Sequence, residues 1–406
     1  MLIILIAILV GGFVFDRILD ILNLRSLVPE LPEEARGIYD EDKYRKSQEY
    51  YKANHRFSQL TSTFSFILVL SMLLMGGFGY LDSWLRQYTQ DTVWLTLIYF
   101  GVLGMASDLL SLPFSIYKTF VIEEKFGFNK TSVKLFILDK LKGYLLTIVL
   151  GGILIAGLVK IYMSSGEYFW IFAWLVMTIL MIFVSMFYTS IFLPIFNKLS
   201  PLEDGELQKA IREYCSKAGF QLNNIFVMDG SKRSSKANAF FSGLGKKKKI
   251  VLYDTLISKH STEELVAILA HETGHYKLKH TRTGLITGVI QTGVMLFILS
   301  LLLGNEMLAQ SLGAQSSSFH LDLIAFGILY SPVSTVLGIL TNMLSRKHEY
   351  EADSFARTSY KAEPLIEALK KLSSDNLSNL LPHSSYVFVH YSHPPLLKRL
   401  AALRKE

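Results

Sequence analysis

The stretch His271-Glu272-Thr273-Gly274-His275 carries the most information in this 406-residue chain. On a helix, residues four positions apart share one face, so the imidazoles of His271 and His275 can bind the same zinc ion. Glu272 would then lie beside the metal, where a carboxylate can act as a general base on water. A match of five residues also arises by chance, so the surrounding sequence has to support it.

The sequence before this motif predicts a helix. Ser261–Glu264 (Ser-Thr-Glu-Glu) has the pattern of a capping box, in which the first and last residues satisfy each other's backbone N–H groups. Leu265, Ile268 and Leu269 follow at helical spacing. The motif therefore falls within a helix, where its spacing has a geometric meaning. This context favours a zinc site over a pair of ordinary core histidines.

A third zinc ligand has to come from elsewhere, because a catalytic zinc ion usually has three protein ligands and one open position. The pattern with a third histidine six residues after His275 is absent, since Thr281 stands there. His280 is expected on a different face of the helix. A later segment offers Glu349 and Asp353 at i, i+4 spacing, so one could bind zinc while the other holds a ligand imidazole. An exposed acidic helix face is the alternative.

Several patterns resemble those of the M48 metallopeptidases, and in particular their CAAX prenyl protease 1 (Ste24-type) branch. They are the H-E-T-G-H motif, Ser345–Asp353 (S-R-K-H-E-Y-E-A-D) and Ser392–Leu400 (S-H-P-P-L-L-K-R-L). The segment Leu31–Tyr51 is also similar to that branch. The resemblance covers the whole chain.

The resemblance implies a role for each residue singled out so far. One zinc ion per chain would have three ligands, His271, His275 and Glu349. Glu272 would be the general base, and Asp353 would hold a ligand imidazole. These roles depend on a distant segment of the chain folding onto the helix that carries the two histidines.

The resemblance also points to residues that contact the substrate. The segment Asn238-Ala239-Phe240 is similar to an edge strand that binds the substrate backbone by strand addition, with an ordinary buried strand as the alternative. His393 is implied in stabilising the oxyanion of the reaction. Arg399 would lie beside it, either supporting the site or contacting the substrate.

Long apolar runs predict a predominantly α-helical polytopic membrane protein. Half of the residues are hydrophobic, and seven runs reach the roughly 20 residues that cross a bilayer. The seven predicted spans are Leu2–Ile21, Leu60–Leu81, Thr92–Phe114, Tyr144–Tyr162, Tyr168–Ile195, Leu285–Leu303 and Leu321–Leu344. The resemblance implies that these helices surround an aqueous chamber.

Basic residues alternate between the predicted loops. Segments 25–59, 115–143, 196–284 and 345–406 hold 7, 6, 15 and 10 of the 41 Lys and Arg residues, whereas the loops after spans two, four and six hold 1, 0 and 0. The positive-inside rule then places the amino terminus outside, and the carboxyl terminus and zinc motif in the cytoplasm. The net charge of +7 is explained by topology, so no nucleic-acid partner is expected. A single Cys215 suits a reducing compartment.

We predict two regions. Residues 1–201 form an amino-terminal membrane region with five spans, and residues 202–406 form a peptidase domain that includes spans six and seven. Strands are expected at Ile225–Asp229, Ala239–Ser242 and Ile250–Tyr253, the last two forming a small β-hairpin around a glycine-containing turn. The catalytic portion would thus be gluzincin-like, with an edge strand beside the metal.

The resemblance implies a zinc endopeptidase in the lipid bilayer that removes the last three residues from a prenylated CAAX peptide. We expect the protein to be a monomer. The membrane would be the inner membrane of a bacterium or the endoplasmic reticulum of a eukaryote. Two alternatives are a quality-control protease with broader peptide substrates and a non-enzymatic membrane protein or transporter with structural zinc. The last is disfavoured, because structural zinc sites are usually closed by four protein ligands.

Overall fold

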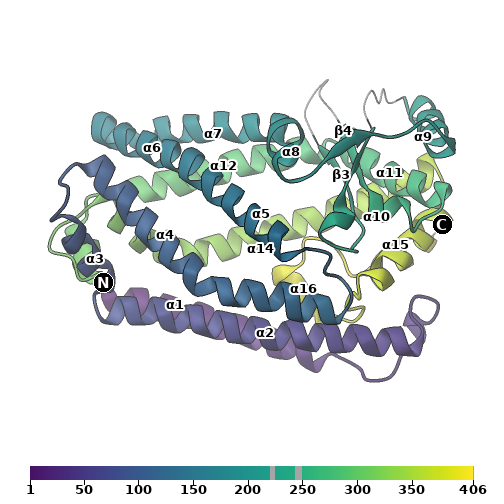
Figure 1. Ribbon diagram of the computed structural model, residues 1–406, viewed down its shortest axis with the longest axis horizontal. Helices are drawn as coiled ribbons and strands as arrows, with labels where there is room; N and C mark the ends of the chain where they lie inside the picture. The colour runs from purple at the N-terminus through teal and green to yellow at the C-terminus, as the bar shows by residue number, and fades with distance from the viewer. Residues whose placement is uncertain (220–224, 243–248, 406) are drawn as a thin grey trace.

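The structure, a computed structural model, describes residues 1–219, 225–242 and 249–405. Long helices run along most of the elongated molecule, and a small sheet with several short helices gathers at one end (Figure 1). The described helices outside the long apolar ones are α3 (Gly77–Leu85), α9 (Glu206–Lys217), α10 (Asp254–Ile257), α11 (Thr262–Lys277), α13 (Glu306–Ser311), α15 (Ala362–Asp375), α16 (Ser384–His390) and α17 (Leu396–Arg404).

Six helical stretches of the described residues are long and apolar enough to cross a membrane. They are Leu2–Arg25 (α1), Glu41–Leu74 (α2), Thr92–Glu123 (α4, Thr92–Tyr117, continued by the π-helical segment Lys118–Glu123), Val133–Phe196, His280–Ser300 (α12) and Phe319–Ser359 (α14). The prediction of a predominantly helical, multi-pass membrane protein is confirmed. The count of seven spans stays a prediction.

The stretch Val133–Phe196 is 64 residues long and covers the predicted fourth and fifth spans. It contains α5 (Val133–Leu146), α6 (Gly152–Ser165), α7 (Phe169–Phe187) and α8 (Leu193–Phe196). Gly166, between α6 and α7, has a φ of 51°, in the left-handed region that a glycine adopts readily. A change of chain direction at this position lets α6 and α7 contact each other.

The predicted second span, Leu60–Leu81, is not one continuous helix. The chain breaks between α2 and α3 at Gly76, whose φ is 64°. Close packing explains the break, because a Cβ on Gly79 would lie only 2.2 Å from the carbonyl carbon of Gly313. The apolar run therefore ends as a helix, a turn and a second short helix packed against a distant loop.

The sheet has four strands in the order β1-β2-β4-β3. Their bounds are Leu199–Pro201 (β1), Ile225–Met228 (β2), Ala239–Ser242 (β3) and Lys249–Tyr253 (β4). β3 and β4 pair antiparallel, with Ala239 opposite Leu252, so the predicted hairpin forms. Its expected turn at 243–245 lies outside the described residues. β2 pairs parallel with β4, which leaves β3 at an edge of the sheet.

The amino-terminal part and the helix of the H-E-x-x-H motif share one hydrophobic core. Tyr39 and Tyr44 are buried in the same cluster as Leu265 and Leu269 of α11. Lys236, just before β3, bonds from Nζ to the Tyr50 hydroxyl of α2 at 2.7 Å and lies 3.0 Å from Glu123 Oε2. The long helices therefore hold both α11 and the edge strand in place.

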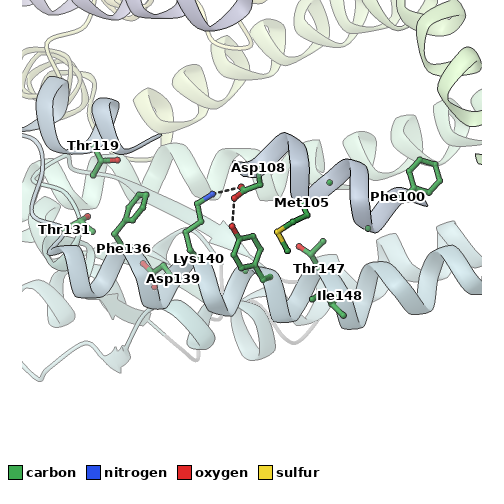
Figure 2. Close-up of a pocket in the computed structure, with 14 residues that line it drawn as sticks. Phe100, Met105, Asp108, Thr119, Thr131, Phe136, Asp139, Lys140, Thr147 and Ile148 are labelled. Atoms are coloured by element: carbon green, nitrogen blue, oxygen red, sulfur yellow. Dashed lines mark hydrogen bonds and ion pairs between the residues drawn. The ribbon is translucent and has the colours of Figure 1, made fainter. Parts of the chain in front are cut away.

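A partly exposed charge within α4 has a partner on the neighbouring helix. Asp108 contacts Lys140 and Tyr144 of α5, with 2.5 Å between Lys140 Nζ and Asp108 Oδ1 (Figure 2). These three side chains line a cavity of about 650 Å³ that also has apolar walls, including Met105 and Phe136. Because an unpaired carboxylate is costly in a bilayer, the contact stabilises the pairing of α4 with α5. None of the predicted site residues lines this cavity.

Candidate functional site

Local sequence places the two motif histidines at the end of α11 that packs on α14. Ser261 and Glu264 form the predicted capping box, with hydrogen bonds of 3.0 and 3.3 Å, so the helix begins at Thr262. Gly274 faces α14, where an added Cβ would lie 3.0 Å from the Cα of Ala352. The absence of a side chain at Gly274 therefore allows the close helix contact that brings the motif to α14.

Three side chains from these two helices converge. His271 Nε2 and His275 Nε2 lie 3.2 Å apart, and they lie 3.5 and 3.2 Å from the Glu349 carboxylate oxygens. Ligand atoms held about 2.0–2.1 Å from a tetrahedral ion lie roughly 3.3 Å from one another. The three donors are therefore spaced as zinc ligands are spaced. The same three residues form a group able to hold a metal ion.

Asp353 and Arg399 contact two members of this group, His271 and Glu349. Asp353 Oδ1 lies 2.9 Å from His271 Nδ1. Arg399 donates from Nε and Nη2 to the two oxygens of Asp353 at 2.8 and 2.6 Å, and its Nη1 lies 3.3 Å from Glu349 Oε2. All of these side chains are buried. Because the Asp353 carboxylate faces His271 Nδ1, it favours the tautomer with its proton on Nδ1, and the Nε2 lone pair is then free to bind a cation.

The donor chemistry fits a metal cation. Glu349 Oε2 is buried and accepts no hydrogen bond from the described residues. Burial alone would lower the pKa of His271, but the Asp353 and Glu349 carboxylates outweigh it and raise this pKa to about 9. The same carboxylate field that favours a proton on the imidazole favours a divalent cation in its place.

A cavity of about 450 Å³ joins the metal-binding group to the other predicted site residues. Its lining includes Asn238, Ala239 and Phe240 of the edge-strand segment, Glu272, His393 and Arg399. His393 lies between α16 and α17, is 65% exposed, and places Nε2 3.3 Å from Glu349 Oε1. Burial raises the pKa of Glu272, and the neighbouring His271 and His275 oppose that rise. The sequence-predicted site residues thus line one cavity, except for Asp353, which contacts His271 Nδ1.

His280 is the neighbour that sequence reasoning missed. Lys279, with a φ of 62°, ends the α11 region in a left-handed turn, and α12 begins at His280. The turn brings His280 Nδ1 to 3.0 Å from His275 Nδ1. The expectation that His280 lies on a different helix face assumed a continuous helix, so it did not find this contact. A positive φ at a lysine gives little signal in the sequence.

Comparison with known proteins identifies the family. A family model described as "CAAX prenyl protease N-terminal, five membrane helices" matches residues 20–198, and one described as "Peptidase family M48" matches residues 201–406. The chain belongs to peptidase family M48. It is 35% identical over 404 residues to "CAAX prenyl protease 1 homolog" of Oryza sativa subsp. japonica, covering 96% of this chain and 94% of that protein.

The likeness to the CAAX prenyl protease 1 branch extends to structure. "CAAX prenyl protease 1" of Saccharomyces cerevisiae is 32% identical over 425 residues, covering 97% of this chain and 93% of that protein. A crystal structure of S. mikatae Ste24p superposes with a TM-score of 0.94 at 31% identity, covering 100% of this chain and 99% of the other. The M48 member described here is therefore a membrane metalloprotease of the CAAX prenyl protease 1 type.

Proposed function

We propose that this M48 protein is a zinc endopeptidase whose metal ligands are His271, His275 and Glu349. The observation that carries the proposal is the convergence of three donor atoms, 3.2–3.5 Å apart, beside a cavity. Two imidazoles and one carboxylate are a usual ligand set for catalytic zinc. When bound, the ion supplies Lewis-acid polarisation of a peptide carbonyl and lowers the pKa of water.

The protein's own groups handle the proton and the substrate. Glu272 takes a proton from water and returns it to the amine that leaves, because its carboxyl group lines the cavity beside the ligand histidines. His393 donates a hydrogen bond to the oxygen that becomes negative as the carbonyl is attacked. Arg399 orients the site rather than binding substrate, since its guanidinium is already shared between Asp353 and Glu349.

The edge strand is the proposed substrate-binding element. β3 pairs on one side with β4. Asn238, Ala239 and Phe240 line the same cavity as Glu272. An extended peptide that adds to this edge would pass its backbone close to the ligand group. Its carbonyl would then face both Glu272 and His393.

The proposed substrate is a prenylated peptide ending in CAAX, from which the last three residues are removed. Support comes from relatives named CAAX prenyl protease 1 that match this chain along more than 90% of its length. A lipidated substrate also suits a site built at the end of membrane helices. We propose that the protein acts as a monomer and needs no nucleic acid.

For the membrane arrangement we propose seven spans, with Val133–Phe196 crossing twice. At about 1.5 Å per residue, 64 helical residues are too long for one crossing of a bilayer about 30 Å thick. In the apolar 18-residue segment of each candidate span, at most 17% of the residues are buried within the protein. Each described span therefore has exposed surface that can face lipid on one side and an aqueous chamber on the other. The basic loops favour a metal site on the cytoplasmic side. We propose that the membrane is the plasma membrane or the endoplasmic reticulum. We also propose that the boundary between the two regions lies near residue 201.

The decisive experiment compares purified wild-type protein with Glu272→Gln on a panel of farnesylated and unmodified peptides. Mass spectrometry identifies the products, and metal analysis measures bound zinc. We expect wild type to release the terminal tripeptide from farnesylated peptides only, and Glu272→Gln to keep one zinc ion per chain without turnover. Cleavage by Glu272→Gln at the wild-type rate would exclude the assigned base. Cleavage of unmodified peptides at equal rates would instead favour a broader protease.

A further inference from the structure

The Nδ1 atoms of the two proposed ligand histidines have different partners. His271 Nδ1 faces the Asp353 carboxylate directly, at 2.9 Å. His275 Nδ1 faces another imidazole, His280, at 3.0 Å. His280 Nε2 in turn lies 2.9 Å from Glu351 Oε2. The second ligand therefore reaches a carboxylate only through an intervening histidine.

Only one arrangement of protons lets this chain of contacts support a metal ligand. A neutral His275 that binds metal through Nε2 carries its proton on Nδ1, so it donates to His280 Nδ1. His280 must then carry its own proton on Nε2 and donate it to Glu351. Both hydrogen bonds are then donated in the same direction, from His275 to His280 and from His280 to Glu351. His280 is only 6% exposed, so water does not readily replace it.

The same residues could be taken for a second metal site, because ligand atoms of His280, His348 and Glu351 lie within 4.8 Å of one another. Two features argue against it. The imidazoles of His280 and His348 are stacked, with centroids 3.9 Å apart and planes at 8°. The nitrogen lone pairs of each ring lie in the plane of that ring, so the lone pairs of two parallel stacked rings lie in separate parallel planes and do not converge on one ion.

The second feature is the shared proton. Metal on His280 Nε2 would move the proton of this neutral imidazole to Nδ1, where it has to be donated to His275 Nδ1. His275 would then carry its proton on Nε2 and lose the lone pair that faces His271 and Glu349. A metal ion on His280 is thus incompatible with His275 as a ligand.

We infer that His280, oriented by Glu351, is a positioning residue that fixes the tautomer and ring orientation of His275 for metal binding. This inference rests on the proposed function, in which His275 is a zinc ligand. It assigns a role to a histidine five residues beyond the motif and to a carboxylate two residues beyond Glu349. Partners of this kind typically change metal affinity by about 10–100-fold.

The test measures zinc affinity of the full-length protein in detergent by competition with a chelator of known affinity. His280→Phe keeps a flat ring but removes the acceptor, and we expect zinc binding about 10–100-fold weaker. His280→Asn places an acceptor atom near the Nδ1 position, so it should recover part of the loss. His348→Phe preserves the stacked ring and is the matched control, expected to bind zinc as wild type does.

Two further readouts separate this role from a purely structural one. The thermal midpoint of the zinc-free protein should be similar in His280→Phe and His348→Phe, whereas only the former weakens zinc. Wild type should bind one zinc ion per chain. Unchanged affinity in a folded His280→Phe, or a second ion lost with His280, would overturn the inference. Absence of zinc binding by wild type would instead reject the proposed function itself.

Discussion

A histidine, an aspartate and an arginine form a cluster near each end of α14. At its start, His320 Nε2 donates to Asp82 Oδ1 at 2.8 Å, and Arg86 Nε donates to Asp82 Oδ2 at 2.8 Å. Near its end, Asp353 similarly joins His271 to Arg399 at 2.6–2.9 Å. His320 and Glu349 are separated by about 44 Å along the helix, at 1.5 Å per residue.

The two clusters differ in what their nitrogen lone pairs do. At the start of α14 the remaining ring nitrogen of His320 lies 3.3 Å from the Thr96 hydroxyl, so both ring nitrogens have polar partners. At the other end, the free nitrogen of His271 points to a second imidazole and a carboxylate beside a cavity. A His–Asp–Arg unit by itself is therefore a structural connection. Converging donor atoms beside a cavity are what distinguish the group that could hold a metal ion.

Glu349→Gln should have the largest effect, because it removes the charged donor that exists only in the metal-binding cluster. An amide is a poor zinc ligand, and the change leaves Arg399 with one carboxylate fewer. We expect peptide cleavage to fall to background and zinc to fall well below one ion per chain, measured by peptide assay and metal analysis. A full complement of zinc in this variant would show that Glu349 is not a ligand.

Asp82→Asn tests the opposite cluster and should destabilise the fold without affecting metal. Breaking a buried pair costs about 3 kcal/mol, and both side chains are at most 2% exposed. The thermal midpoint in detergent should fall, while zinc stoichiometry stays at one per chain. Loss of zinc at a temperature where the variant is folded would mean that the two clusters are coupled along α14.

The acid dependence of stability sharpens this test. Burial by itself would raise the pKa of Asp82, but hydrogen bonds from His320 and Arg86 outweigh it and lower the pKa. A carboxyl with a folded pKa below its unfolded value of about 3.9 stabilises the fold above that pH, and loses this contribution as the pH falls through the folded pKa. Between about pH 5 and pH 3, wild type should therefore lose more stability than Asp82→Asn. Equal losses would contradict the assigned ion pair.

The residues that converge between α11 and α14 were predicted as two local pairs, and the family resemblance joined the pairs. The i, i+4 pairs His271/His275 and Glu349/Asp353 each lie on one helix, and helical periodicity together with the family resemblance was enough to associate them. The capping box and the hairpin of β3 and β4 followed from equally local patterns. In contrast, Asp82 and His320 are 238 residues apart with no shared motif, so only the fold brings them together.

Breaks in helices were the features that the sequence concealed. The glycine turn at Gly76 divides an apolar run that reads as a single span, and the reason lies in a distant contact with Gly313. Lys279 adopts a left-handed conformation that its residue type does not favour, and it redirects His280 toward His275. In both cases tertiary packing overrides local propensity, which is information that periodicity does not contain.

Gly274→Ala should have the smallest effect and isolates helix packing from ligand chemistry. An added Cβ would lie 3.0–3.2 Å from the backbone of Ala352 and the Cβ of Phe355, so α11 has to move away from α14 by a few tenths of an ångström. We expect a loss of about 1–3 kcal/mol in stability and zinc binding weakened by about tenfold, toward the lower end of the effect of disturbed ligand orientation.

Gly338→Ala is the matched control, because this glycine of α14 has open space where a Cβ would be placed. Alanine favours helix more than glycine does, so Gly338→Ala should be neutral or slightly stabilising. If Gly274→Ala binds zinc as tightly as Gly338→Ala, the metal donors tolerate a shift between their two helices. The close approach of α11 to α14 would then not be what distinguishes the two ends of α14.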